Sequence, residues 1–170
     1  GRVSNEYFDK YRFESDPVLL AEVAEAMATL VPEGIEVLAG LEMGGIPVVT
    51  ALARVTGLPA CFVRKSAKKY GTAKFAEGAD VDGKRVLIVE DVITSGGQVV
   101  LSTADLRGIG AQITDVVCVI DRSEGGTDRS GSGARARGLR RPQRSTGRAD
   151  QRRGARRIRR RGRHGEAGPH

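Results

Sequence analysis

The sequence predicts an α/β protein with an open, mainly parallel sheet that is flanked by helices. Two observations indicate this fold. Segments with helical spacing alternate along the chain with short runs of strand length. Residues 85–89 form a mostly apolar, β-branched run of the kind found in strands that are covered on both faces, and 112–120 are expected to form another. The 170 residues correspond to roughly one domain.

The first predicted element is a helix from Asp16 to Val31. Asp16 is a favourable N-cap, and Pro17 suits the first helical position. Pro32 and Gly34 are expected to end the helix. Apolar residues recur at helical spacing and form one face, which consists of Leu19, Leu20, Val23, Ala24, Met27, Leu30 and Val31.

The remaining elements follow from apolar runs and from the glycines that separate them. Strands are predicted at 35–41, 60–63, 85–89 and 112–120, helices at 46–55 and 98–109, and a loop at 90–97. Residues 64–82 carry five basic side chains and no periodicity, so they are predicted to form a long exposed loop. Long loops inside compact domains are commonly functional.

The charge is divided unevenly along the chain. Residues 1–126 carry 13 basic and 18 acidic side chains, a net charge of −5, whereas residues 127–170 carry 15 arginines, three acids and no lysine, a net charge of +12. We therefore predict a folded domain at 1–126 and a disordered Arg/Gly-rich tail at 127–170 that replaces the C-terminal part of the fold. The overall charge of +7 averages two unlike segments and does not indicate nucleic-acid binding.

Several functional classes are excluded by composition. The chain contains no run of 18 apolar residues, so no membrane-spanning helix is predicted. Cys61 and Cys118 lie far apart in apolar runs and are expected to be buried, reduced thiols, as in a cytoplasmic protein. Both histidines lie in the tail, so the domain has no His-based triad or His/Cys zinc site. Because Gly1 is not an initiator Met, we expect the natural N-terminus to lie upstream.

The segment 86–98 carries the strongest chemical signal. A predicted buried strand ends in Glu90 and Asp91, and the turn Thr94-Ser95-Gly96-Gly97 then opens a helix. Ligands of open α/β sheets bind at the carboxyl ends of strands, and a glycine-rich turn before a helix forms a cradle for phosphate. The carboxylates can accept sugar hydroxyls or bind a hydrated divalent cation. The alternative is a simple strand–turn–helix corner with two solvated acids.

This segment resembles the phosphoribosyl pyrophosphate signature of type I phosphoribosyltransferases. Three further stretches narrow the resemblance to orotate phosphoribosyltransferases. These are Gly1–Asp9, similar to the end of the N-terminal substrate motif, Phe62–Gly71, similar to the mobile catalytic loop, and Asp121–Gly126, similar to the Asp-Arg-x-Glu-Gly-Gly turn.

The resemblance implies a role for each matching residue. Lys68, Glu90 and Asp91 would be catalytic, and Thr94 and Arg122 would contact orotate. The residues that would bind phosphoribosyl pyrophosphate or diphosphate are Gly44, Gly45, Arg64, Lys65, Lys68, Tyr70, Glu90, Asp91, Val92, Ile93, Thr94, Ser95, Gly96, Gly97 and Gln98. The resemblance further implies a homodimer with shared sites and Mg²⁺ held by substrate phosphates and water, with no direct protein ligand.

The residue set agrees with that chemistry. Displacing diphosphate from an anomeric carbon develops positive charge on the ribose and negative charge on the leaving group, so positioning and charge neutralisation matter most. A loop with several lysines and arginines can supply the positive charge. A regulator of the same fold and a transferase acting on another nucleobase remain as alternatives, and retention of Lys68 with Arg122 favours the enzyme.

The chain departs from the family pattern at two positions, and its tail has an unusual composition. The family's orotate-contacting lysine is expected just before Gly1, outside the chain, and Tyr70 stands where many members carry a histidine. Within 127–170 the only apolar residues are Leu139, Ile158 and five alanines, too few to form a core. The tail consists almost entirely of Arg, Gly, Ala, Pro, Ser and Asp, which is the composition that an out-of-frame reading of GC-rich codons gives. This favours a frameshifted reading frame over an Arg-rich arm for RNA or acidic partners.

Overall fold

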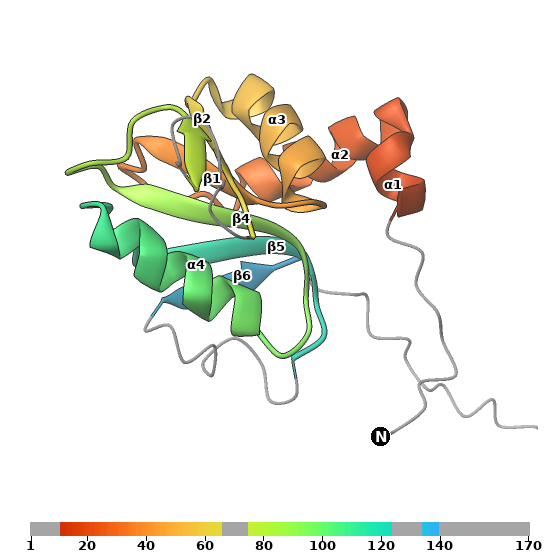
Figure 1. The fold of residues 1–170 in the computed structure, drawn as a ribbon. Helices are drawn as coiled ribbons and strands as arrows, with labels where there is room; N and C mark the ends of the chain where they lie inside the picture. The colour runs from red at the N-terminus through yellow and green to blue at the C-terminus, as the bar shows by residue number, and fades with distance from the viewer. Residues whose placement is uncertain (1–10, 66–74, 124–133, 140–170) are drawn as a thin grey trace, which may run out of the picture.

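The computed structural model describes residues 11–65, 75–123 and 134–139 (Figure 1). Several sequence predictions fall outside these residues. They include the roles of Lys68 and Tyr70, the motif 1–9 and the domain boundary after residue 126. No helix within the described ranges is both long and apolar enough to cross a membrane.

A six-stranded sheet forms the centre of the molecule, in the order β3-β2-β1-β4-β5-β6. The strands are β1 (Val37–Leu41), β2 (Ala60–Val63), β3 (Ala76–Gly78), β4 (Val86–Ile93), β5 (Asp115–Asp121) and β6 (Arg135–Gly138). All neighbouring pairs are parallel except β2 and β3. The predicted open, mainly parallel sheet is therefore confirmed.

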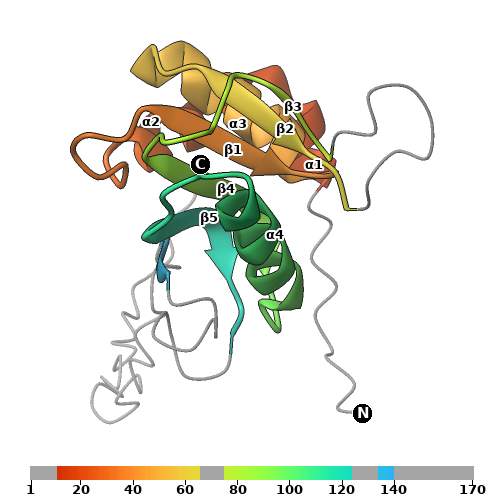
Figure 2. The same cartoon turned by 60° about the vertical axis from the view of Figure 1, so that its left-hand side comes forward.

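Helices cover both faces of this sheet (Figures 1 and 2). The helices are α1 (Tyr11–Ser15), α2 (Pro17–Ala28), α3 (Gly45–Thr56) and α4 (Gly97–Gly108). Met27 of α2 and Leu52 of α3 belong to one core cluster with Leu87 of β4, while Leu106 of α4 packs with Ile88 in the other. Successive side chains of β4 thus fill the cores on opposite faces of the sheet.

Helix α2 begins as its sequence predicts. The Asp16 carboxylate accepts hydrogen bonds from the backbone N–H groups of Val18 (2.9 Å) and Leu19 (3.2 Å), and Pro17 occupies the first turn. The helix ends at Ala28, three residues before the predicted end. Backbone hydrogen bonds that span three residues, such as Val31 N–H to Ala28 O at 3.3 Å, tighten the chain there. Val31 precedes Pro32, and the helical conformation is unfavourable for a residue before proline.

Three elements of the structure lie outside the set predicted from the sequence. Helix α1 was not predicted, and β3 lies within the segment 64–82 that was expected to be a loop. Strand β6 lies within the predicted tail, so residues 134–139 belong to the sheet edge and correct that expectation. The Arg137 Nε–Asp115 Oδ1 contact of 3.2 Å ties β6 to β5. Short edge strands lack the long apolar runs that identify central strands.

Candidate functional site

The predicted site residues that fall within the described ranges lie where the parallel strands end. Strand β1 leads into the N-terminus of α3, β4 leads through a short turn into α4, and β5 leads to Arg122. The Arg122 N–H donates to Ile93 O at 2.8 Å, which joins the ends of β4 and β5. The carboxyl edge of an open parallel sheet is the usual ligand site of this architecture.

The turn between β1 and α3 packs tightly against β4. A Cβ atom on Gly44 would lie 2.0 Å from Asp91 Oδ2 and 2.8 Å from Glu14 Oε1, and one on Gly45 would lie 2.7 Å from Val89 O. Only glycine allows this approach. The backbone of residues 44–45 is thereby held directly beside the Asp91 carboxylate. Two parts of the predicted site that lie far apart in the sequence are thus brought together.

Glu14 is a site neighbour that the sequence analysis missed. It lies on α1, and its carboxylate, like that of Asp91, occupies the space that a Cβ atom on Gly44 would need. The segment preceding α2 carries no strong periodic signal, so nothing in its spacing places Glu14 at the sheet edge. Only the tertiary structure, in which α1 packs against α2, brings it there.

Glu90 and Asp91 lie inside β4 and are buried, with 9% and 1% of their surfaces exposed. The sequence placed them at the start of a loop, but the strand continues to Ile93. The Asp91 carboxylate accepts a hydrogen bond from the Val92 N–H at 2.6 Å. Burying ionisable groups is costly, so two adjacent buried carboxylates indicate more than a solvated corner between a strand and a helix.

These carboxylates make the end of β4 electronegative. Burial, followed by the charges of Asp121, Glu90 and Asp91, raises the pKa of the Cys118 thiol to about 12. Asp121 also accepts hydrogen bonds from Ser123 N (2.9 Å) and Ser123 Oγ (2.6 Å), which shape the turn after β5. Such a region suits hydroxyl groups or a cation rather than a phosphate.

The turn between β4 and α4 provides the opposite electrostatic character. Gly96 is the N-cap of α4 with φ +75°, and no side chain caps the helix. Thr94 and Ser95 are exposed beside it. An α-helix N-terminus presents N–H donors and partial positive charge, which favour an anion. The turn is therefore suited to a phosphate, next to the carboxylates that suit a sugar.

The donor set at the end of β4 is compatible with Mg²⁺. Mg²⁺ prefers oxygen ligands and keeps several waters when one or two carboxylates and substrate phosphates hold it. Glu90 and Asp91 offer carboxylate oxygens of this kind at the carboxyl end of β4. Within the described ranges, no three His, Cys, Asp or Glu side chains form a group that could hold a metal ion.

Arg64 and Lys65 follow β2, beside the end of β1. The Arg64 N–H donates to Phe75 O at 2.7 Å, which extends the antiparallel pairing of β2 with β3. The Lys65 N–H donates to Glu42 Oε2 at 2.9 Å. These two predicted diphosphate-binding residues therefore lie next to the turn that carries Gly44, while Lys68 and Tyr70 fall outside the described residues.

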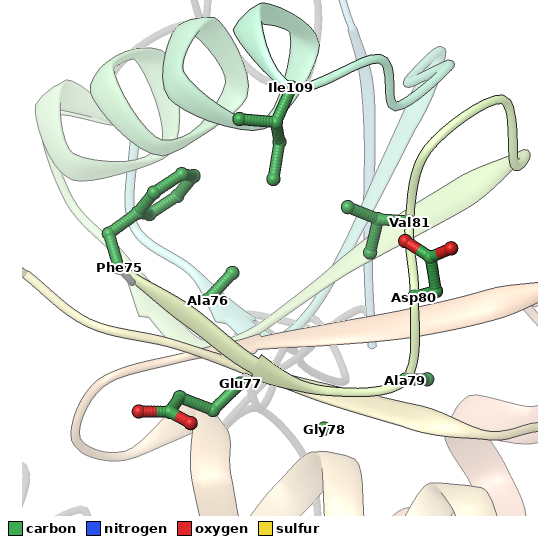
Figure 3. Close-up of a pocket in the computed structure, with 8 residues that line it drawn as sticks. All are labelled: Phe75, Ala76, Glu77, Gly78, Ala79, Asp80, Val81 and Ile109. Carbon is green, nitrogen blue, oxygen red and sulfur yellow. The ribbon is translucent and has the colours of Figure 1, made fainter. Parts of the chain in front are cut away.

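Two cavities lie near β3. One of about 720 Å³ is lined mainly by β3, the chain that follows it and Ile109, and Figure 3 shows Phe75, Ile109 and Val81 directed into it. None of the predicted site residues lines this cavity. A second cavity, of about 410 Å³, is lined by Glu42, Ile46, Phe62, Val63, Arg64 and Glu77. It adjoins the predicted diphosphate side of the site.

Comparisons with known proteins identify the family of this chain. Residues 12–132 match the phosphoribosyl transferase domain family. The chain is 55% identical over 126 residues to the orotate phosphoribosyltransferase of Nocardioides sp., covering 74% of this chain and 70% of that protein. It is 41% identical over 128 residues to the orotate phosphoribosyltransferase of Methanocella arvoryzae, covering 75% and 73%.

Solved structures show the same fold. The orotate phosphoribosyltransferase of Mycobacterium tuberculosis in complex with 5-phospho-α-D-ribosyl 1-diphosphate superposes with a TM-score of 0.67 and 29% identity, covering 78% of each chain. The same enzyme in complex with inorganic phosphate gives a TM-score of 0.69 and 31% identity, covering 78% of this chain and 75% of that one. The chain therefore belongs to the phosphoribosyltransferase family and, within it, to the orotate phosphoribosyltransferases.

Proposed function

We propose that this chain transfers the phosphoribosyl group of 5-phosphoribosyl 1-diphosphate to orotate, giving orotidine 5′-phosphate and diphosphate in pyrimidine biosynthesis. One observation carries the proposal: the buried Glu90–Asp91 pair lies between the uncapped N-terminus of α4 and the backbone at Gly44. A sugar phosphate that carries a leaving group has one part for each of these features: a phosphate for the helix N-terminus, hydroxyl groups for the carboxylates, and a leaving group for the turn at Gly44. The names of the relatives identify the acceptor base.

The proposed substrate fits the site in a defined orientation. The 5′-phosphate accepts hydrogen bonds from the turn Thr94–Gln98, where the α4 N-terminus favours an anion. The ribose hydroxyls donate to Glu90 and Asp91. The diphosphate then extends past Gly44 toward Arg64 and Lys65, the cationic residues after β2.

The reaction exchanges one bond at the anomeric carbon for another. The bond from this carbon to the diphosphate oxygen breaks, and the oxygen leaves with the electron pair. A ring nitrogen of orotate forms the new carbon–nitrogen bond and gives up its proton, which the departing diphosphate or water accepts. Positive charge on the ribose is stabilised by the nearby carboxylates, and negative charge on diphosphate is neutralised by Arg64 and Lys65. The resemblance adds Lys68 to this set.

Orotate and the remaining components are assigned by the same reasoning. Arg122 follows β5 next to Ile93, and its planar guanidinium suits the orotate carboxylate. Thr94 lies on the adjacent turn. Bound Mg²⁺ would neutralise part of the diphosphate charge, held by substrate oxygens and water near Glu90 and Asp91. We further expect a cytoplasmic homodimer, as the family resemblance implies.

Diphosphate release tests this proposal. The protein is incubated with 5-phosphoribosyl 1-diphosphate and Mg²⁺, with orotate, uracil or a purine base as acceptor. We expect release with orotate only. Release with another base and not with orotate would reassign the acceptor, while binding of the sugar diphosphate without turnover on any base would support a regulator and contradict the enzyme.

A further inference from the structure

Glu42, in the turn after β1, forms two hydrogen bonds with the end of β2 and the residues that follow it. The Glu42 N–H donates to Val63 O at 2.8 Å, and Glu42 Oε2 accepts from the Lys65 N–H at 2.9 Å. Arg64 lies between these two partners. Glu42 therefore contacts the chain on both sides of Arg64, one contact through its backbone and the other through its side chain.

The opposite side of Arg64 is fixed as well. Its own N–H donates to Phe75 O at 2.7 Å, so the backbone at Arg64 is held to β3 while Lys65 is held to Glu42. Glu42 also lines the cavity of about 410 Å³ together with Arg64. The direction in which the chain leaves β2 is thus set by β3 and by a single carboxylate.

A carboxylate at this place is electrostatically unfavourable for the proposed substrate. Glu42 lies two residues before Gly44, on the side of the site that would receive diphosphate, and like charges repel. The side chain is exposed, so its hydrogen bond adds little to stability. A role in positioning explains a negative group here better than a role in folding.

We propose that Glu42 is a positioning residue, whose carboxylate holds the Lys65 backbone and thereby directs Arg64 and Lys65 toward the diphosphate. The proposal rests on the proposed function and deepens it. Glu42 acts through the residues it orients and need not touch the substrate. Its hydrogen-bonding capacity, rather than its charge, is the property that matters.

Two substitutions separate these properties. Glu42→Ala removes the hydrogen bond and the charge, whereas Glu42→Gln removes the charge and keeps an acceptor oxygen. We expect Glu42→Ala to lower kcat/KM for 5-phosphoribosyl 1-diphosphate by about tenfold, because even a small displacement of a positioned group lowers the reaction rate. We expect Glu42→Gln to stay within about threefold of the wild type, and KM for orotate to change little in either variant.

Glu36 provides a matched control at the other end of the sheet. Glu36 Oε2 also accepts a backbone N–H, from Arg85, at the same distance of 2.9 Å. Glu36→Ala therefore removes an equivalent bond far from the site, together with the exposed ion pair between Glu36 Oε1 and Lys84 Nζ (3.1 Å), and should leave both KM values unchanged. Thermal denaturation of all three variants checks that each is folded.

The outcomes are distinct. If the wild type itself gives no turnover, the proposed function fails, and binding of inorganic diphosphate with Mg²⁺ then tests Glu42 separately: it should weaken in Glu42→Ala and persist in Glu42→Gln. If the wild type is active and Glu42→Ala matches it, the positioning role is refuted. Equal losses in the Ala and Gln variants, or an equal rise in KM for orotate, would also refute it.

Discussion

Gly44→Ala tests the geometry of the site most sharply, because the substitution adds one methyl group and little else. Gly44 has φ −67° and ψ −29°, values that alanine adopts without strain. The new Cβ, however, would lie 2.0 Å from Asp91 Oδ2, whereas real Cβ contacts almost never fall below 3.0 Å. The Asp91 carboxylate must therefore retreat by about 1 Å, or the turn must move away from β4.

A displacement of that size has a predictable cost. Misplacing a positioned group by about 1 Å lowers rates by roughly 100-fold, equivalent to about 2.7 kcal/mol of transition-state stabilisation. We expect kcat/KM for 5-phosphoribosyl 1-diphosphate to fall by that factor. Overpacking is also expected to lower the free energy of unfolding by about 1–3 kcal/mol. Diphosphate release and thermal denaturation measure the two effects.

Gly108→Ala is the matched control. Gly108 ends α4, and nothing lies within 4 Å of a Cβ placed on it. Alanine is favoured over glycine in a helix by roughly 0.5–1 kcal/mol, so this variant should be at least as stable as the wild type and equally active. If folded Gly44→Ala shows wild-type kinetics, the claim that activity requires the close approach of Gly44 to Asp91 is refuted.

Three further predictions follow from other parts of the molecule. Lys68→Ala should lower kcat far more than it weakens binding of 5-phosphoribosyl 1-diphosphate, and an unchanged kcat would remove Lys68 from catalysis. Arg122→Ala should raise KM for orotate by about tenfold or more, through loss of a charge-assisted hydrogen bond, with little change in KM for the sugar diphosphate; equal effects on both would count against the assignment. Burial raises the pKa of Cys61 to about 11, and burial with nearby carboxylates raises that of Cys118 to about 12, so both should resist alkylation at neutral pH. Because unfolded thiols ionise near pH ~8.5, the free energy of unfolding should fall as pH rises from about 9 toward these values, and urea titrations that show no such fall would contradict the burial of both thiols.

The central part of the fold could be predicted from sequence because its signals are local. The Asp16-Pro17 start of α2 and the apolar run of β4 each depend on a few adjacent residues. The turn from β4 to α4 was recognisable for the same reason: glycine at a positive φ, as at Gly96, is required by the backbone itself. These features explain why the turn could be recognised from the sequence as a candidate phosphate site.

The remaining features depend on contacts between distant segments. Nothing near Glu14 indicates that α1 would bring its carboxylate to Gly44, and nothing near Glu42 indicates its bond to Lys65. Strand β6 was missed because its residues, Arg135–Gly138, carry no strand pattern and gain their place by parallel pairing with β5. Edge strands and site neighbours of this kind are determined by tertiary structure rather than by local propensity.

Identification of the reaction product tests the central claim most directly. The protein is incubated with orotate, 5-phosphoribosyl 1-diphosphate and Mg²⁺, and the products are separated and identified by mass spectrometry. The Asp91→Asn variant, whose folding is checked by thermal denaturation, is assayed in parallel. The site described above predicts orotidine 5′-phosphate and diphosphate in equal amounts from the wild type, and at least about 100-fold less from Asp91→Asn. Folded wild-type protein that forms no nucleotide, or an Asp91→Asn variant that forms it at the wild-type rate, would contradict the account.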